Sequence, residues 1–262
     1  KEKGGPVKLI LLTNDDGVQS PGLLALKQAL GAVGEVAVLA PDHNWSAGGH
    51  AKTMHKPLRV QEVKLADGST AMASNGGPSD CVALAVLGVL SRAPDLVISG
   101  INPGSNVAQD MTYSGTVAAA LEGWISGISS MALSVAVEEG TLPEFACAAR
   151  VGAIIAGRIL EQGQHQVLLN VNVPALPFDR LNGVEITRLG RRIYRDKLVE
   201  RSDPRGHKYY WIGGEPPTGV DDEGTDVGAL AAGRVSVTPL QLDLTSYPIM
   251  DELRAWNLGI GG

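Results

Sequence analysis

Short apolar runs alternate with longer amphipathic stretches along this chain. The run 7–12 is branched and apolar, which is typical of a strand covered on both faces. Ser20 and Pro21 then resemble an N-cap and a first helical position, and leucines recur at helical spacing as far as Leu30. A second apolar run covers 35–40. The first forty residues therefore predict a strand, a helix and a parallel strand, which form a right-handed βαβ unit.

The same alternation continues through the middle of the chain. The pattern predicts helices over 78–90, 114–126 and 145–160, strands over 94–99, 128–137 and 166–173, and a hairpin beside the main sheet over 58–73. Strands that alternate with helices in this way are typical of a doubly wound α/β fold. We therefore expect a mostly parallel sheet with helices on both faces.

The pattern changes after Pro174. The segment 186–220 combines arginines, tyrosines and Trp211 with paired glycines and prolines, and we interpret it as an extended arm. Aromatic and arginine side chains are favoured in interface cores, so the arm is expected to contact another subunit. Order returns with a helix capped by Thr225, a strand over 235–244 and a helix over 248–256. The prediction is one α/β domain with its core at about 7–185 and 221–258.

Composition and net charge limit the classes of binding partner that the protein can have. A chain of 262 residues with 44% hydrophobic residues can bury one large core. Its net charge of −6 and isoelectric point near 5.4 give no general attraction to nucleic acid or to anionic membranes, so a phosphate ligand must be held locally. The arginines of the arm could contact a nucleic acid, but the acidic charge of the whole chain disfavours this alternative. We expect no nucleic-acid and no membrane partner.

The number of cysteines and the length of the apolar runs indicate the cellular compartment of the protein. Cys81 and Cys147 each lie in an apolar, helical stretch, which favours buried thiols in a reducing compartment over a disulfide. No apolar run approaches the roughly 20 residues of a membrane span, and the apolar stretch after Lys1 and Lys3 is too short for a signal peptide. A cytoplasmic protein is the resulting expectation.

Two adjacent carboxylates, Asp15 and Asp16, follow the first predicted strand, with Asn14 before them. Open α/β sheets bind ligands outside the carboxyl ends of their strands, and paired acids at that position suggest a metal ion. The sequence Asn-Asp-Asp-Gly is equally typical of a simple turn. The residues at the ends of the other predicted strands are needed to distinguish a metal site from a simple turn.

Three further polar segments fall at the same predicted edge. Each also has an ordinary explanation as loop solvation, a turn or a helix cap. Small residues at the start of a helix expose backbone N–H groups and favour a phosphate, while hydroxyl and amide oxygens suit Mg²⁺ or Mn²⁺. The residues concerned are Ser46 in the loop 41–50, Asn102 and Asn106 after the strand that ends at Ser99, and Ser114, Gly115 and Thr116 at a helix start. Their coincidence favours a metal site beside an anion site.

Longer motifs carry a family resemblance over roughly the first half of the chain. The segments 11–22, 40–46, 78–81, 99–106 and 113–123 resemble the SurE survival protein family. The resemblance implies a Rossmann-like, three-layer domain with a C-terminal excursion that exchanges between subunits, giving a homodimer or homotetramer. It also implies a metal-dependent phosphomonoesterase that hydrolyses nucleoside 5′- and 3′-monophosphates, and also short polyphosphate.

The resemblance carries over residue by residue. It implies one divalent ion per subunit, Mg²⁺ or Mn²⁺, with the ligands Asp15, Asp16, Ser46 and Asn102. It places Asn14, Asn106, Ser114, Gly115 and Thr116 around the phosphate. Asp15, Asp16 and Asn14 are the candidate catalytic residues, and Asp15 is the candidate that orients the attacking water.

Some features depart from the family or leave alternatives open. Gly77 stands where members commonly carry Thr, so a hydroxyl is missing, and the loop with Gly48, Gly49 and His50 is one of several variants. His50 is either a loop residue or an acid or base near Ser46.

Other functions remain as alternatives. A haloacid dehalogenase-type phosphatase requires two acids separated by one residue, whereas Asp15 and Asp16 are adjacent. A non-catalytic nucleotide-binding regulator is compatible with the fold, but no Gly-x-Gly-x-x-Gly follows the first strand. The five histidines lack a His-Glu-x-x-His pattern, which disfavours zinc hydrolysis.

Overall fold

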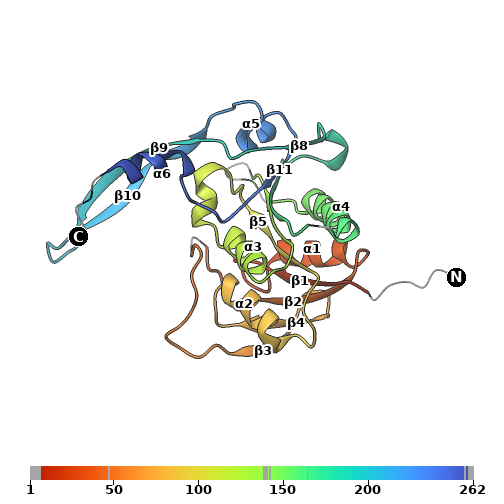
Figure 1. Cartoon of the computed structure of the whole chain (residues 1–262). Helices are drawn as coiled ribbons and strands as arrows, with labels where there is room; N and C mark the ends of the chain where they lie inside the picture. Colours follow the sequence, from red (N-terminus) through yellow and green to blue (C-terminus); the bar gives the residue numbers. More distant parts are fainter. Residues whose placement is uncertain are drawn as a thin grey trace.

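A nine-stranded sheet forms the centre of the computed structural model, which describes residues 7–46, 48–137, 141, 143–163, 165–256 and 258 (Figure 1). The spatial order of the strands is β3-β4-β2-β1-β5-β6-β7-β11-β8. Their bounds are β1 Leu9–Thr13, β2 Glu35–Pro41, β3 Val60–Lys64, β4 Thr70–Ser74, β5 Leu96–Pro103, β6 Ser130–Val135, β7 Leu168–Val173, β8 Val184–Ile186 and β11 Val235–Pro239. Neighbours are parallel except for the pairs β3–β4 and β7–β11.

Helices cover both faces of this sheet (Figure 1). Their bounds are α1 Pro21–Leu30, α2 Pro78–Leu84, α3 Gly115–Ile125, α4 Ala146–Gln162, α5 Asp226–Ala231 and α6 Tyr247–Ala255, with short helical turns η1 Ala85–Val89, η2 Ala108–Tyr113 and η3 Phe178–Arg180. Alternate residues of β1 face opposite layers: Ile10 and Leu12 pack in the core with α1 and α4, whereas Leu11 packs with α2 and α3. The expected doubly wound, three-layer α/β fold is confirmed.

Several elements differ from the sequence expectation. Strand β5 runs on to Pro103, so Asn102 lies within the strand and not after it, and β8 at Val184–Ile186 is not among the predicted strands. The helix expected over 78–90 is α-helical only to Leu84 and ends in the π-helical turn η1, where Gly88 has φ +128°. The hairpin β3–β4 does not stand beside the main sheet but extends it, because β4 pairs in parallel with β2. The last strand ends at Pro239 rather than at residue 244.

The C-terminal hairpin projects from the body (Figure 1). It consists of β9 Arg192–Ser202 and β10 Lys208–Gly219, paired antiparallel. Several of its large side chains are exposed, among them Trp211 at 64%. The predicted hairpin excursion is confirmed. No helix in the described part of the chain is long and apolar enough to cross a membrane.

Candidate active site

A depression of about 290 Å³ opens at the carboxyl edge of the sheet. Five residues singled out in the sequence line it: Asp15, Ser46, Asn102, Asn106 and Ser114. Pro103, Asp110 and Tyr113 complete the lining. The loops after β1 and β2, the end of β5 with the loop that follows it, and the start of α3 therefore meet at one place.

Asp15 is held firmly at the base of this depression. Its side chain is 4% exposed, and its Oδ1 accepts a 2.6 Å hydrogen bond from the hydroxyl of Thr116. A Cβ on Gly115 would lie 2.9 Å from Asp15 Oδ2, so only glycine lets the start of α3 approach this closely. Burial raises the pKa of Asp15 above its ordinary value, and the hydrogen bond from Thr116 opposes that rise.

Asp16 has an unsatisfied carboxylate oxygen. Its Oδ2 is buried and has no hydrogen-bond partner. Burial, and then the neighbouring Asp15 carboxylate, raise the pKa of Asp16 to about 6. Among the described residues, no Lys, Arg or His forms an ion pair with either acid. A bound cation would compensate both of their charges. Asp16 is not among the residues that line the depression itself.

Neutral oxygens complete the set that could hold a metal. The backbone N–H of Ser46 donates to Asn44 Oδ1 at 2.7 Å, a local turn that leaves the Ser46 side chain exposed at the depression. Asn102 Nδ2 donates to Gly104 O at 2.6 Å, which leaves its Oδ1 as the acceptor. Across the described ranges no three His, Cys, Asp or Glu side chains gather as a metal site. Carboxylate, hydroxyl and amide oxygens are the kinds of ligand that hard divalent cations prefer.

The start of α3 faces the same space. Ser114 is the N-cap, and its hydroxyl accepts from the N–H of Val117 at 3.1 Å. The first N–H groups of a helix have no intrahelical partner and favour an anion. Ser114 is thus both an ordinary cap and a wall of the site, while Gly115 and Thr116 contact Asp15.

The side chain of Asn14 forms hydrogen bonds with the backbone of Gly17. Its Nδ2 donates to Gly17 O at 3.1 Å, and its Oδ1 accepts from Gly17 N at 3.2 Å. Gly17 has φ +101°, as such a turn requires. Asn14 and Gly17 therefore form the turn that the sequence Asn-Asp-Asp-Gly predicts. The two carboxylates between them lie at the carboxyl edge of the sheet.

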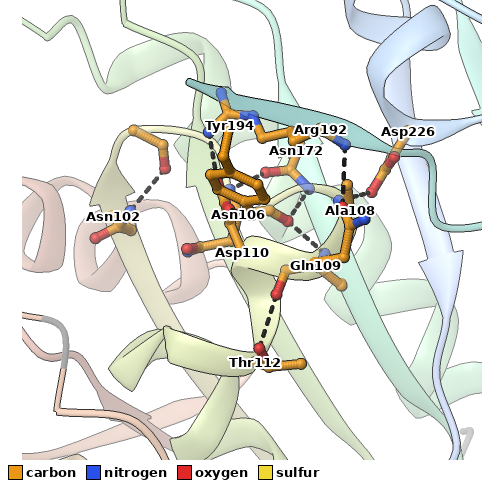
Figure 2. Close-up of polar contacts among 12 residues, drawn as sticks. Asn102, Asn106, Ala108, Gln109, Asp110, Thr112, Asn172, Arg192, Tyr194 and Asp226 are labelled. Atoms are coloured by element: carbon orange, nitrogen blue, oxygen red, sulfur yellow. Dashed lines mark hydrogen bonds and ion pairs between the residues drawn. The ribbon is translucent and has the colours of Figure 1, made fainter. Parts of the chain in front are cut away.

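Sequence reasoning missed the residues that hold Asn106 (Figure 2). The N–H of Asn106 donates to Asn172 Oδ1 at 2.8 Å, and its carbonyl accepts from Asn170 Nδ2 at 2.7 Å and from Asn172 Nδ2 at 3.1 Å. Its side-chain Nδ2 donates to Ser134 Oγ at 2.9 Å. Two asparagines at alternate positions of the buried strand β7 were the available signal, because both point to one face.

The C-terminal part of the chain also reaches the site loop (Figure 2). Buried Asp226 accepts from the N–H of Ala108 at 2.8 Å and from that of Gly190 at 2.7 Å. Asp110, in the wall of the depression, accepts from Arg192 and from the Tyr194 hydroxyl at the base of β9. The hairpin is therefore fastened directly to a site residue.

The fold and the site define a class of protein: a Rossmann-like α/β protein in which a helix start faces a pair of acids, an arrangement suited to a phosphate ester held with a divalent cation. Residues 10–196 match the family model described as Survival protein SurE. The chain belongs to the SurE family, as its motifs indicate.

Relatives match over nearly the whole length. A protein of Herpetosiphon aurantiacus named 5′-nucleotidase SurE is 53% identical over 253 residues, which covers 95% of this chain and 98% of that protein. A protein of Chloroflexus aggregans with the same name is 51% identical over 248 residues, 94% of this chain and 98% of that one. The crystal structure of the SurE protein from Aquifex aeolicus superposes with a TM-score of 0.80 at 40% identity, covering 94% of this chain and 98% of that chain.

Proposed function

We propose that this protein is a metal-dependent phosphomonoesterase that releases phosphate from nucleoside 5′- and 3′-monophosphates, and also from short polyphosphate. The names of its relatives support a nucleotidase. The observation that carries the proposal is the contact of Asp15 with Gly115 and Thr116, which sets a carboxylate against a helix start. A phosphate at that helix start needs a cation between it and the acids.

In this proposal one Mg²⁺ or Mn²⁺ per subunit is held by Asp15, Asp16, Ser46 and Asn102. The unpaired Asp16 oxygen and the free Asn102 amide oxygen support the assignment. When bound, a divalent cation supplies positive charge to the phosphoryl oxygens.

The chain's own residues then bind and orient the reactants. The N–H groups at the start of α3, capped by Ser114, bind the phosphoryl oxygens, and Asn106, which lines the same depression, helps to orient them. Asp15 orients the attacking water, because the hydrogen bond from the Thr116 hydroxyl fixes the orientation of its carboxylate.

The assembly and location belong to the same proposal. The exposed aromatic residues of the hairpin support its use as the contact between subunits of a homodimer or homotetramer. Cys81 and Cys147 are both free, which supports a reducing, cytoplasmic location.

The test is phosphate release from a panel of nucleoside monophosphates, p-nitrophenyl phosphate and short polyphosphate, each with Mg²⁺, Mn²⁺ or EDTA. Release that EDTA abolishes, and that Asp15→Asn or Asp16→Asn removes from a folded protein, is the expected result. Nucleotide binding without release would make the protein a regulator. A trapped phosphoenzyme would instead indicate haloacid dehalogenase-type chemistry.

A further inference from the structure

Helix α3 carries a buried carboxylate that the proposed mechanism does not use. Glu122 lies roughly two turns beyond the phosphate-facing start of the helix and is only 3% exposed. Lys52 Nζ lies 2.6 Å from Glu122 Oε1, and His50 Nε2 lies 3.1 Å from Oε2. Both partners come from one short loop. A buried carboxylate that loses its partners is strongly disfavoured, so the position of Glu122 and that of the loop depend on each other.

This loop, residues 48–53 and called here the anchored loop, follows directly after the Ser46 region. It has two further attachments. The N–H of Gly49 donates to the carbonyl of Tyr113 at 3.2 Å, at the rim of the depression. Thr53 donates to Asp80 twice, from its N–H at 2.9 Å and from its hydroxyl at 2.6 Å. The loop is therefore fixed along its length.

Ser46 lies between this loop and a second fixed point. On its other side the N–H of Trp45 donates to the backbone carbonyl of Asp15 at 2.7 Å. The side chain of Ser46 is exposed, and its backbone N–H donates to Asn44 Oδ1 at 2.7 Å. Its position relative to Asp15 therefore depends on the chain on either side of it. On the C-terminal side the N–H of Gly48 donates to the carbonyl of Trp45 at 3.1 Å, and beyond this turn His50 and Lys52 contact Glu122.

We propose that Glu122 is a positioning residue for the metal site, and this inference rests on the proposed function. Through Lys52 and His50 it holds the anchored loop, and with it the Ser46 hydroxyl, against the same helix whose start binds the phosphate. His50 then acts as a loop anchor, with its Nε2 directed to a buried carboxylate, and not as an acid or base toward the substrate. One helix fixes both the anion site and one neutral ligand of the cation.

The test uses the full chain and four variants: Glu122→Gln, Lys52→Met, Lys52→Arg and His50→Gln. Two readouts do not depend on turnover. Calorimetric titration measures Mn²⁺ affinity, and hydrogen exchange of the Gly49 and Thr53 amides measures how firmly the loop is held. Phosphate release against Mn²⁺ concentration separates metal affinity from kcat.

Glu122→Gln is expected to weaken Mn²⁺ binding about tenfold and to speed exchange at Gly49, while kcat at saturating Mn²⁺ is largely kept. Lys52→Met is expected to act in the same direction. Lys52→Arg keeps the charge and is expected to restore most of the affinity. If Glu122→Gln does not fold, Lys52→Met and His50→Gln carry the test, because both residues are partly exposed.

The matched control is Leu30→Val, a buried change at the far end of α1 that touches neither the loop nor the site. Mn²⁺ affinity that is unchanged in Glu122→Gln and Lys52→Met, or that is weakened equally by Leu30→Val, overturns the inference. If the wild-type protein neither binds Mn²⁺ nor releases phosphate, the proposed function fails instead. Amide exchange in the anchored loop then still decides whether Glu122 holds it.

Discussion

The hydroxyl of Thr116 donates a 2.6 Å hydrogen bond to Oδ1 of Asp15, across a separation of 101 positions in the chain. This bond joins the first turn of α3 to the carboxyl end of β1. It fixes the orientation of a buried carboxylate. The anion site and the acid pair are thereby coupled in one rigid unit.

Thr116→Val removes this bond and keeps the shape of the side chain. Because the bond lowers the pKa of Asp15, its loss raises that pKa further. We expect kcat to fall about tenfold or more, with the acid limb of the pH–rate profile moved to higher pH. Thr116→Ser, which keeps the hydroxyl, is the control. An unchanged profile in the valine variant would show that the bond does not orient Asp15.

Gly115→Ala tests the close approach of α3 to Asp15. The added Cβ would lie 2.8 Å from Asp15 Cβ and 2.9 Å from Oδ2, so the carboxylate or the helix must shift. We expect loss of both thermal stability and phosphate release. Gly157→Ala in α4 is the matched control, because nothing lies within 4 Å of its new Cβ. That variant should gain up to about 1 kcal/mol from helix propensity. Equal effects of the two substitutions would contradict the steric argument.

The metal-free protein should lose stability as pH rises through the pKa of Asp16. That pKa is raised from 3.8 to about 6 on folding, so the neutral form favours the folded state. The contribution is fully present below about pH 4 and is lost as pH rises past about 6. In EDTA, Asp16→Asn should therefore be more stable than wild type at about pH 7.5, and the difference should shrink at about pH 4.5.

When metal is present, Asp16→Asn should be less stable than wild type, which is the opposite of the result expected in EDTA. Saturating Mn²⁺ should raise the Tm of wild type more than that of Asp16→Asn, because only wild type offers both carboxylates. The stabilisation by Mn²⁺ should weaken below about pH 6, where protons compete for Asp16. A Tm difference in EDTA that is independent of pH would contradict the assignment of the raised pKa to Asp16.

Asn172→Ala tests the support of Asn106. It leaves the buried N–H of Asn106 without its partner, and we expect a loss of about 1–3 kcal/mol in unfolding free energy. Because Asn106 lies in the wall of the site, the KM for nucleotide should rise as well. Asn182→Ala, at an exposed asparagine that donates to Ala232 O, is the control. If the KM of Asn172→Ala equals that of wild type, Asn172 contributes to stability but not to nucleotide binding.

Local patterns predicted much of the fold. The run up to Leu12, the Ser20-Pro21 helix start and the Thr225 cap each depend on neighbours within a few positions, and all three elements are observed. The same holds for the polar residues at strand ends, because the carboxyl ends of parallel strands meet at one edge. Five of the predicted site residues line one depression for this reason.

Contacts between distant segments could not be predicted in the same way. Nothing near Asn106 indicates that β7 supports it from 66 positions away, or that Asp226 holds Ala108 across 118 positions. The early end of α2 had a local signal in Gly88, but apolar spacing continues past it and conceals the break. Neither the burial of Glu122 nor its pairing with His50 can be read from helical spacing alone.

The position of β11 in the sheet has a consequence for synthesis of the chain. β11 lies between β7 and β8 in space, yet it follows both in sequence. When residues 184–186 leave the ribosome, the strand that will pair with them has not been made. Asp226, which holds the site loop, is also still to come. A nascent chain can complete the strands from β3 to β7 early, but this end of the sheet and the support of the site loop must wait until residues 226–239 have been made.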